Sequence, residues 1–292
     1  MNIWKNRIFT PMLLKEVDKP FNSSDYLYEI KFDGYRAILF VNKDGITIRS
    51  RNKIDITNMY PELKSITKLV KKNTIIDGEI IALENGYPSF SKLSERSRTK
   101  DVSKIKYHMK NNPVTFIAFD ILYQDKDLTN LSLIERKEIL SKIKDNDVFV
   151  KSKIYSDGIK LFKKVGSLNL EGIVAKKKDS LYEINKRTFS WVKIKNNIHE
   201  SFLIGGYIIK KMSISLLLGE LKDNKLYYVG NVRLNKNHKL YNKIISMKKT
   251  KSSFINYNKK DAIFIEPKYK CMVKYLERTK TNHLRQPIIE KV

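Results

Sequence analysis

The sequence has little cysteine and little histidine, which excludes several classes of protein. Cys271 is the single cysteine among 292 residues, so an internal disulfide bond is impossible. A cysteine-rich zinc module is excluded as well, because its ligands are several Cys or His residues close together. The four histidines are far apart in the sequence and predict no metal cluster; they are His108, His199, His238 and His283.

Long apolar runs are also missing. No run approaches the ~20 residues that a membrane-spanning helix needs. The N-terminus carries Trp4 and Lys5 where the apolar core of a signal peptide would begin. We therefore expect a cytoplasmic protein that makes no contact with a membrane.

Acidic residues are scarce relative to basic ones. The chain has 58 Lys and Arg against 31 Asp and Glu, a formal net charge of +27 that is spread from end to end. Such a field attracts polyanions, of which nucleic acid is the usual one. The alternative is a solvated basic surface that reflects only a composition rich in Lys and Asn. Composition thus favours a nucleic-acid partner, and with it a nucleoid-associated location.

Residues 26–33 alternate in character, which predicts a half-buried strand. Glu29, Lys31 and Asp33 fall on one face, so the strand would point them into a shared cleft. Further expected elements are a hairpin over 37–49, a helix over 61–71, a strand over 74–83 interrupted at 77–79, a strand over 114–123, and a helix that begins at the capping box of Ser132 and Glu135.

The pattern of apolar segments and turns in the sequence changes near residue 198. From there on, short apolar segments separated by turns predict a small β-barrel such as an OB-fold, with one helix near 240–248. The expected class is α+β: a first domain, 1–198, of antiparallel sheets with flanking helices, and a second, 199–292, that forms the barrel.

Six short elements in a fixed order carry the chemistry. They are Lys31-Phe32-Asp33-Gly34-Tyr35-Arg36, Ser50-Arg51-Asn52-Lys53, Asp77-Gly78-Glu79, Phe119-Asp120, Glu171-Gly172-Ile173-Val174-Ala175-Lys176 and Trp191-Val192-Lys193-Ile194-Lys195. An ammonium is not a nucleophile, so Lys31 must lose a proton to react, and neighbouring cations such as Arg36, Lys193 and Lys195 would favour that loss. The same cations would hold a triphosphate.

Carboxylates and an aromatic ring complete the expected site. Glu171 is the first candidate ligand for Mg²⁺ or Mn²⁺, with Glu79 and Asp33 in support, because these ions prefer carboxylate and phosphate oxygens. Phe119 offers a flat face for a purine, and Glu29 could read the exocyclic amine of that base. Lys176 is expected to face the base or the phosphates.

Each of these residues also has a structural explanation. Phe119 could be core, Asp77 and Asp120 could be turn or strand-end carboxylates, and Lys193 and Lys195 an exposed strand face. Arg49 and Arg51 could be edge charges of the hairpin. All of these explanations would have to hold together to account for the ordered series.

The six elements resemble the motifs of the covalent nucleotidyltransferases, the superfamily of DNA ligases, RNA ligases and mRNA capping enzymes; Lys53 stands where the second motif has glycine. The resemblance implies that Lys31 forms a phosphoramidate with a nucleoside monophosphate, and that Glu79 contacts either the ribose or the metal. The residues expected to bind the nucleotide are Glu29, Ile30, Arg36, Arg51, Glu79, Phe119, Lys176, Lys193 and Lys195.

Longer strings narrow the resemblance to ATP-dependent DNA ligases of the bacterial end-joining kind, the ligase-D type. They are residues 10–13, 28–37, 171–180, 202–207 and 284–287. The resemblance implies ATP as co-substrate, transfer of adenylate from Lys31 to the 5′-phosphate of a nick or break in duplex DNA, and sealing by the 3′-hydroxyl. It also implies a monomer, a Ku-like end-binding partner, and separate polymerase and nuclease proteins.

The last motif of that family is short here, since only five residues follow Pro287. Because this motif orients pyrophosphate, we expect a less efficient first step, with Arg285 or Lys291 in compensation. The alternatives are an mRNA capping guanylyltransferase, an RNA ligase, and a non-catalytic DNA-binding protein of the same fold. An NAD-dependent ligase is disfavoured because the chain has no cysteine-based zinc finger.

Overall fold

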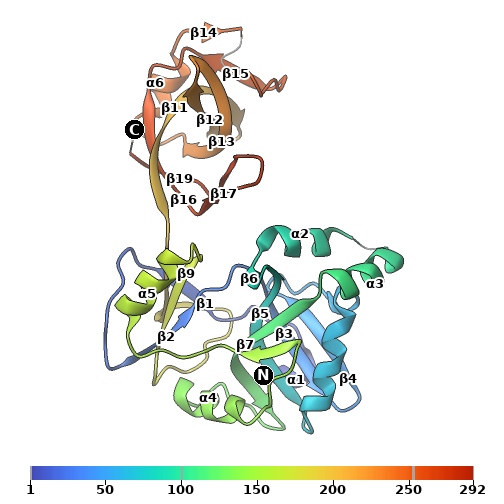
Figure 1. The fold of residues 1–292 in the computed structure, drawn as a ribbon. Coiled ribbons are helices and arrows are strands. Elements are labelled where there is room, and N and C mark those ends of the chain that lie inside the picture. Colours follow the sequence, from blue (N-terminus) through green and yellow to red (C-terminus); the bar gives the residue numbers. More distant parts are fainter. Residues whose placement is uncertain (1, 100, 252–253, 292) are drawn as a thin grey trace. The chain divides into compact units, whose positions relative to one another are not determined.

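The chain forms two compact units, Met1–Asn196 and Asn197–Val292. The computed structural model describes residues 2–99, 101–251 and 254–291 (Figure 1). The domain boundary expected from the sequence, between 198 and 199, falls two residues beyond the division, inside the first strand of the second unit.

The first sheet of the first unit carries the lysine motif. Its order is β1 (Leu13–Glu16), β10 (Arg187–Lys195), β9 (Gly172–Lys177) and β2 (Tyr26–Ile30), antiparallel except for the parallel pair β1–β10. Helix α5 (Gly158–Ser167) packs on β9 and β2. Strand β2 is buried on both faces, not one, because Tyr28 packs under α5 while Leu27 joins a cluster with Trp191.

The second sheet supplies the opposite wall. Its order is β4 (Gly45–Ser50), β3 (Tyr35–Asn42), β5 (Thr74–Glu84), β7 (Val114–Gln124) and β8 (Phe149–Lys151), with β6 (Tyr87–Pro88) paired to β5. All pairs are antiparallel except β7–β8. The predicted hairpin is confirmed as β3–β4. The predicted interruption at 77–79 is wrong, because β5 continues through it and absorbs the irregularity as register shifts against β7.

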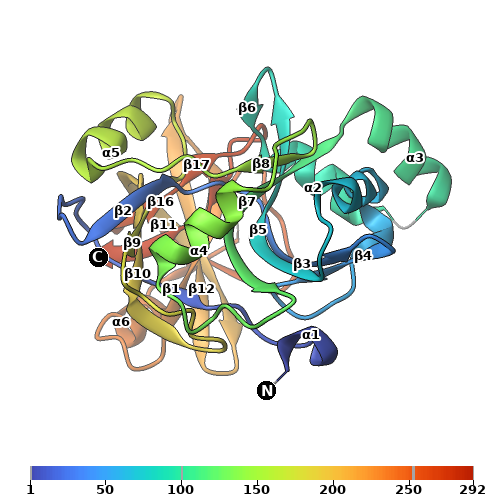
Figure 2. The ribbon, with the colours of Figure 1, turned by 90° about the horizontal axis from the view of Figure 1, so that it is seen from below.

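Helices flank these sheets (Figures 1 and 2). They are α1 (Ile3–Asn6), η1 (Thr57–Met59), η2 (Pro61–Leu69), α2 (Phe90–Arg98), α3 (Val102–Asn111) and α4 (Leu133–Ser141). The predicted α-helix over 61–71 is a 3₁₀ segment, in which Leu63 and Ile66, three residues apart, share the buried face. Helix α4 begins at the predicted capping box of Ser132 and Glu135 and packs on β7.

The described residues of the second unit form a β-sheet with one short helix, α6 (Tyr241–Ile245), and the first three strands of the sheet are longer than the segments expected from the sequence. The sheet runs β13 (Lys225–Asn235), β12 (Ser213–Lys222), β11 (Ile198–Lys210), β15 (Ala262–Ile265) and β14 (Lys249–Thr250); β16 (Lys270–Tyr275) joins β11 to β19 (Ile288–Lys291), and β17 (Glu277–Arg278) pairs with β18 (Leu284–Arg285). Strand β11 pairs with β12, β15 and β16, and the unit has an apolar core that includes Phe202, Leu216 and Val273.

Among the residues that the structure describes, no helix combines the length and the apolar character that crossing a bilayer requires.

Candidate active site

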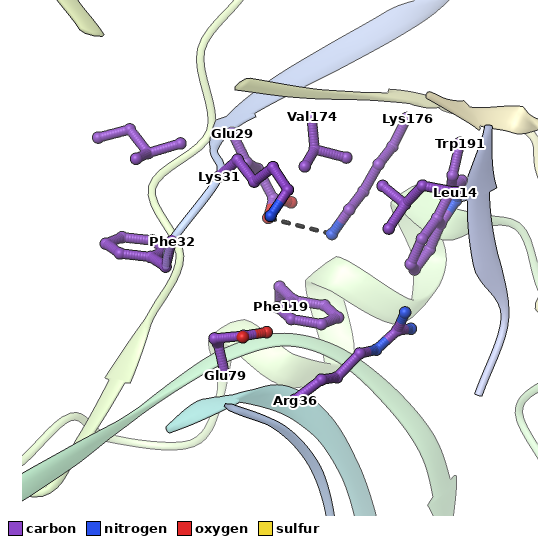
Figure 3. A pocket seen from close by; sticks show the side chains of 11 residues that line it. Leu14, Glu29, Lys31, Phe32, Arg36, Glu79, Phe119, Val174, Lys176 and Trp191 are labelled. Atoms are coloured by element: carbon purple, nitrogen blue, oxygen red, sulfur yellow. Dashed lines mark hydrogen bonds and ion pairs between the residues drawn. The ribbon is translucent and has the colours of Figure 1, made fainter. Parts of the chain in front are cut away.

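A pocket between the two sheets of the first unit gathers most of the expected nucleotide-binding residues (Figure 3). The space inside it, with the open mouth included, is about 450 Å³. The first sheet and the segment after β2 contribute Leu14, Glu29, Ile30, Lys31, Phe32, Val174, Lys176 and Trp191, and the second contributes Arg36, Glu79 and Phe119.

Lys31 lies just beyond the end of β2 and is ion-paired. Its backbone N–H donates to the carbonyl of Gly172 at 2.9 Å, which extends the pairing of β2 with β9. Its Nζ lies 2.6 Å from Oε2 of Glu171; the Lys31 side chain is 21% exposed and the Glu171 side chain 4%. Burial raises the pKa of Glu171, an effect that the ammonium of Lys31 opposes. The ion pair therefore holds the Lys31 side chain beside Glu171 at the pocket.

Two glycines of the motifs permit close approaches of the backbone. A Cβ on Gly34 would lie 2.2 Å from the carbonyl oxygen of Ile80, so glycine lets the chain pass β5 beside Glu79. Gly172 has φ +150°, and a Cβ there would lie 2.1 Å from the carbonyl oxygen of Ile194. Glycine at both positions is thus required to bring Lys31, Glu79 and Glu171 together.

Arg36 is held by a buried carboxylate. Its guanidinium makes two hydrogen bonds with Asp77, at 3.0 and 2.6 Å, and the hydroxyl of Tyr182 donates to the same carboxylate at 2.6 Å. Arg36 also lies over the ring of Phe119, 5.3 Å from its centroid. Since Asp77 balances its charge, Arg36 contributes less to the field at Lys31 than the sequence suggested.

Glu79 lies on β5 and lines the pocket. Burial raises the pKa of this carboxyl to about 8, with the charges of Lys31 and Arg36 acting in the opposite direction. A carboxyl of this kind holds a proton near neutral pH and can donate one hydrogen bond as well as accept others.

The inner end of the pocket is a buried cluster around Glu29. The carboxylate of Glu29 receives Lys176 at 3.0 Å through one oxygen and Lys137 of α4 through the other. The ammonium of Lys176 also lies 4.3 Å from the ring centroid of Phe119 and 4.4 Å from that of Trp191. Burial lowers the pKa of Lys176 to about 8, although Glu29 opposes the shift.

Lys193 and Lys195 share one face of β10 with Trp191, as predicted, while Val192 and Ile194 pack beneath α5 on the other. Lys193 pairs with Glu16 of β1 at 3.0 Å. Burial lowers the pKa of Lys195, and the charge of Lys193 adds to this effect. Neither lysine lines the pocket itself, but both lie on the strand that borders it.

Arg51 is a third expected nucleotide-binding residue, after Lys193 and Lys195, that does not line the pocket. It is exposed in a turn, where its N–H donates to the carbonyl of Arg36 at 3.1 Å. Lys53 of the same turn has φ +67°, a left-handed conformation that glycine adopts at lower cost. This explains why glycine suits that position, although Lys53 occupies it here.

The expected metal ligands do not form a ready-made cluster. Within the described ranges, no group of three or more His, Cys, Asp or Glu side chains is arranged to hold a metal ion. Glu171 and Asp33 are nevertheless close enough for the charge of Asp33 to raise the pKa of Glu171. One or two carboxylates fit Mg²⁺, which takes its remaining ligands from water and from phosphates of a bound nucleotide.

Several residues of the site were not found from the sequence. Lys137 and Glu16 belong to no motif, although they pair with Glu29 and Lys193. In the sequence, a Lys on a polar helix and a Glu at a strand end cannot be distinguished from solvated surface charges. Leu14, Phe32 and Val174 line the pocket through ordinary apolar positions. For Asp120 the sequence left a structural and a functional role open; it is buried and makes two hydrogen bonds with Arg136, at 2.8 and 2.9 Å.

Comparison with known families covers most of the chain. Residues 11–195 match the family described as ATP dependent DNA ligase domain, and residues 210–292 match the ATP dependent DNA ligase C terminal region. The SPbeta prophage-derived DNA ligase-like protein LigB of Bacillus subtilis is 33% identical over 96% of this chain and 97% of its own length. The multifunctional non-homologous end joining protein LigD of Mycolicibacterium smegmatis is 31% identical over 96% of this chain, which spans 37% of that protein.

Solved structures agree with these matches. A mycobacterial DNA ligase D complexed with ATP and MES has a TM-score of 0.61 and 26% identity, covering 97% of this chain and 94% of that one. The match with a Lig E DNA ligase covers 96% of this chain and 98% of that one, with a TM-score of 0.66 and 16% identity. At this identity the match supports the fold alone. The expected α+β architecture with an OB-fold after the nucleotidyltransferase unit is therefore confirmed. On the family matches and the LigB relative together, the chain belongs to the ATP-dependent DNA ligases.

Proposed function

We propose that Lys31 is the residue that carries adenylate during ligation. Its neutral amine attacks the α-phosphorus of ATP, the amine proton is lost, and pyrophosphate leaves. A 5′-phosphate oxygen of DNA then attacks the same phosphorus and releases Lys31. The 3′-hydroxyl attacks the activated 5′-phosphate, forms the phosphodiester bond and expels AMP.

The observation that carries this proposal is the position of Lys31 at the pocket. Its side chain is accessible, its partner Glu171 is a single carboxylate, and the remaining walls offer an aromatic ring at Phe119 and a carboxyl at Glu79. Breaking the pair with Glu171 would free the Lys31 side chain to approach a phosphate. We assign to Phe119 the stacking of adenine and to Glu79 a hydrogen bond to the ribose, for which its partly protonated carboxyl is suited.

The other expected residues take supporting roles in the proposal. Glu29 accepts from the exocyclic amine of the base, and Ile30 packs beside it. Lys193 and Lys195 attract the β- and γ-phosphates from the neighbouring strand, as Arg36 does at the second sheet. We also propose that Arg51 contacts a phosphate. For this contact, the exposed turn that carries Arg51 would have to move toward the pocket.

We further propose Mg²⁺, or Mn²⁺ in its place, as the metal of the reaction. Glu171 would hold it together with phosphate oxygens, with Asp33 or Glu79 as a second carboxylate. The metal would neutralise phosphate charge when bound. Glu171 would then serve two cationic partners, the metal and the Lys31 side chain with which it pairs in this structure.

Labelling tests the proposal directly. The protein is incubated with α-³²P-ATP and Mg²⁺ and run on a denaturing gel beside Lys31→Ala, then chased with nicked duplex DNA. We expect a covalent label that requires Lys31 and disappears as the nick is sealed. Lys31 would be excluded as the carrier if the wild type seals nicks and the Lys31→Ala variant still becomes covalently labelled.

We propose that the physiological substrate is nicked or broken duplex DNA in end joining. Several of the similar proteins, from mycobacteria and from Bacillus subtilis, are named for non-homologous end joining, which supports this assignment. The exposed strings Lys210–Lys211 and Lys248–Lys251 of the second unit are suited to phosphate contacts, and the charge of +27 supports binding that weakens with salt.

The assembly in the cell is part of the same proposal. We propose a monomer, associated with the nucleoid in the cytoplasm, that acts beside a Ku-like end-binding protein and separate polymerase and nuclease proteins. Joining of linear DNA with cohesive ends, measured with and without an added bacterial Ku protein, tests this. We expect Ku to stimulate end joining and to leave the sealing of a nick unchanged; equal rates with and without Ku would contradict the partnership.

A further inference from the structure

The buried cluster at the inner end of the pocket contains a lysine that no motif includes. Lys137 comes from α4, is 8% exposed, and does not line the pocket. It follows Arg136, which reaches Asp120 of β7, while Lys137 reaches Glu29 of β2. Two adjacent side chains of α4 thus connect the helix to both sheets that form the pocket.

The contacts of Glu29 fix the orientation of its carboxylate. Each oxygen receives a different ammonium, Oε1 from Lys137 and Oε2 from Lys176, and the residue is 2% exposed. Burial alone would raise the pKa of Glu29, but the two ammonium groups outweigh it and hold the pKa below the usual value. Glu29 therefore lines the pocket as an ionised, acceptor-only group.

The two lysines differ in how freely they could adjust. Lys176 lines the pocket and its ammonium is already committed to the rings of Phe119 and Trp191. Lys137 touches Glu29 from behind, so it can influence a bound base only through that carboxylate. Its effect on the reaction is that of a positioning residue.

We propose that Lys137 sets the choice of nucleotide by holding the Glu29 carboxylate ionised and in place, so that the pocket accepts a 6-aminopurine and rejects a 6-oxopurine. An adenine amine donates to such an acceptor, whereas the O6 of hypoxanthine or guanine would face it acceptor to acceptor. A mispaired polar group in a buried site is penalised strongly. The proposal rests on the proposed function of this pocket as the site where Lys31 is adenylated.

Removal of Lys137 should change the hydrogen-bonding character of Glu29. With one ammonium left, the buried carboxyl takes up a proton more readily. A protonated carboxyl offers an O–H donor, which suits O6 of a 6-oxopurine. Loss of Lys137 is therefore expected to relax selectivity as well as to weaken use of ATP.

The test compares covalent labelling by α-³²P-ATP and α-³²P-ITP, which differ at position 6 of the base, in the full-length protein. We expect the wild type to prefer ATP by about 100-fold or more in the rate of labelling per nucleotide concentration. In Lys137→Met the preference should fall at least about tenfold, and in Lys137→Arg, which keeps the cation, it should fall less. Lys142→Met, an exposed lysine just after α4, is the matched control and should keep the wild-type ratio.

The ratio separates positioning from a merely structural role, because a loosened fold would lower labelling by both nucleotides together. A wild type without preference for ATP, or a folded Lys137→Met with an unchanged ratio, would overturn the proposal. If Lys137→Met fails to fold, Glu29→Gln alters the same carboxylate without touching α4, and its ratio must fall for the proposal to stand. A label that does not depend on Lys31 would instead refute the proposed function.

Discussion

The pocket has two lysine–glutamate pairs whose surroundings differ. At the mouth, Lys31 pairs with Glu171 and remains 21% exposed; at the inner end, Lys176 pairs with Glu29 and is almost fully buried against two aromatic rings. Burial lowers the pKa of Lys176 to about 8, so an argument from acidity alone would choose it as the nucleophile. Its contacts argue otherwise, because its ammonium is held by Glu29 and by the rings of Phe119 and Trp191. Solvent exposure and, among the described residues, the absence of aromatic contacts at its ammonium therefore distinguish Lys31, the proposed nucleophile, from Lys176, which shapes the pocket.

The sharpest test of this comparison removes each ammonium in turn. We expect Lys31→Met to lose covalent adenylate entirely. Lys176→Met should still form it on Lys31, with the rate per ATP concentration reduced about 10- to 100-fold because Glu29 loses a charged hydrogen bond. Radiolabelling followed by peptide mapping measures both. Label on residue 176 in the Lys31 variant would reverse the assignment.

The residues at the mouth of the pocket can be predicted from the sequence more completely than those at its inner end. Lys31, Glu79 and Glu171 lie in motifs whose glycines leave a readable pattern. Lys137 and the pairing of Arg36 with Asp77 depend on which strands and helices meet, and no local pattern encodes that. Local propensity likewise gave the capping box of Ser132 but not the 3₁₀ form of η2, where packing of Leu63 and Ile66 decides the geometry.

The partner of Lys31 provides the second test. Glu171→Gln keeps the shape of the side chain but removes the negative charge that pairs with Lys31 and would bind metal. We expect adenylation to fall about 10- to 100-fold at a fixed low Mg²⁺ concentration, since one charged contact at a reacting site is worth this much. A titration with Mg²⁺ should then show a higher requirement than in the wild type. An unchanged requirement would argue against Glu171 as the metal ligand.

Glu79 allows a test through stability and pH. Its pKa in the folded protein, about 8, lies above the ordinary 4.5, so the folded state binds more protons than the unfolded state between these values. The free energy of unfolding should therefore fall as pH rises from about 4.5 to about 8. In Glu79→Gln this fall should shrink by about 1–3 kcal/mol, since each pKa unit corresponds to about 1.4 kcal/mol. Urea unfolding at pH 5 and pH 8 measures it, and parallel pH profiles of the two proteins would refute the shift.

The smallest effect is expected at the turn that carries Arg51, outside both pairs. Lys53 adopts φ +67°, which costs a side-chain-bearing residue about 1 kcal/mol relative to glycine. Lys53→Gly should raise the free energy of unfolding by up to about 1 kcal/mol, while Lys72→Gly, an exposed loop position where no such φ occurs, should lower it or leave it unchanged. Thermal unfolding of both variants checks this; equal shifts would mean that the turn is not strained.

The pairing of β2 with β9 makes one strand register responsible for both ends of the pocket. Glu29 and Lys31 come from β2 and the residue after it, Lys176 and Glu171 from β9 and the residue before it, and Ile30 stands opposite Ile173. A slip by one residue would turn Lys31 to the opposite face and separate both ion pairs at once. The register of the two strands thus fixes a distance. Glu29, which would read the base, and Lys31, whose amine would attack the phosphate, are two residues apart along the chain, which corresponds to about 7 Å in a strand.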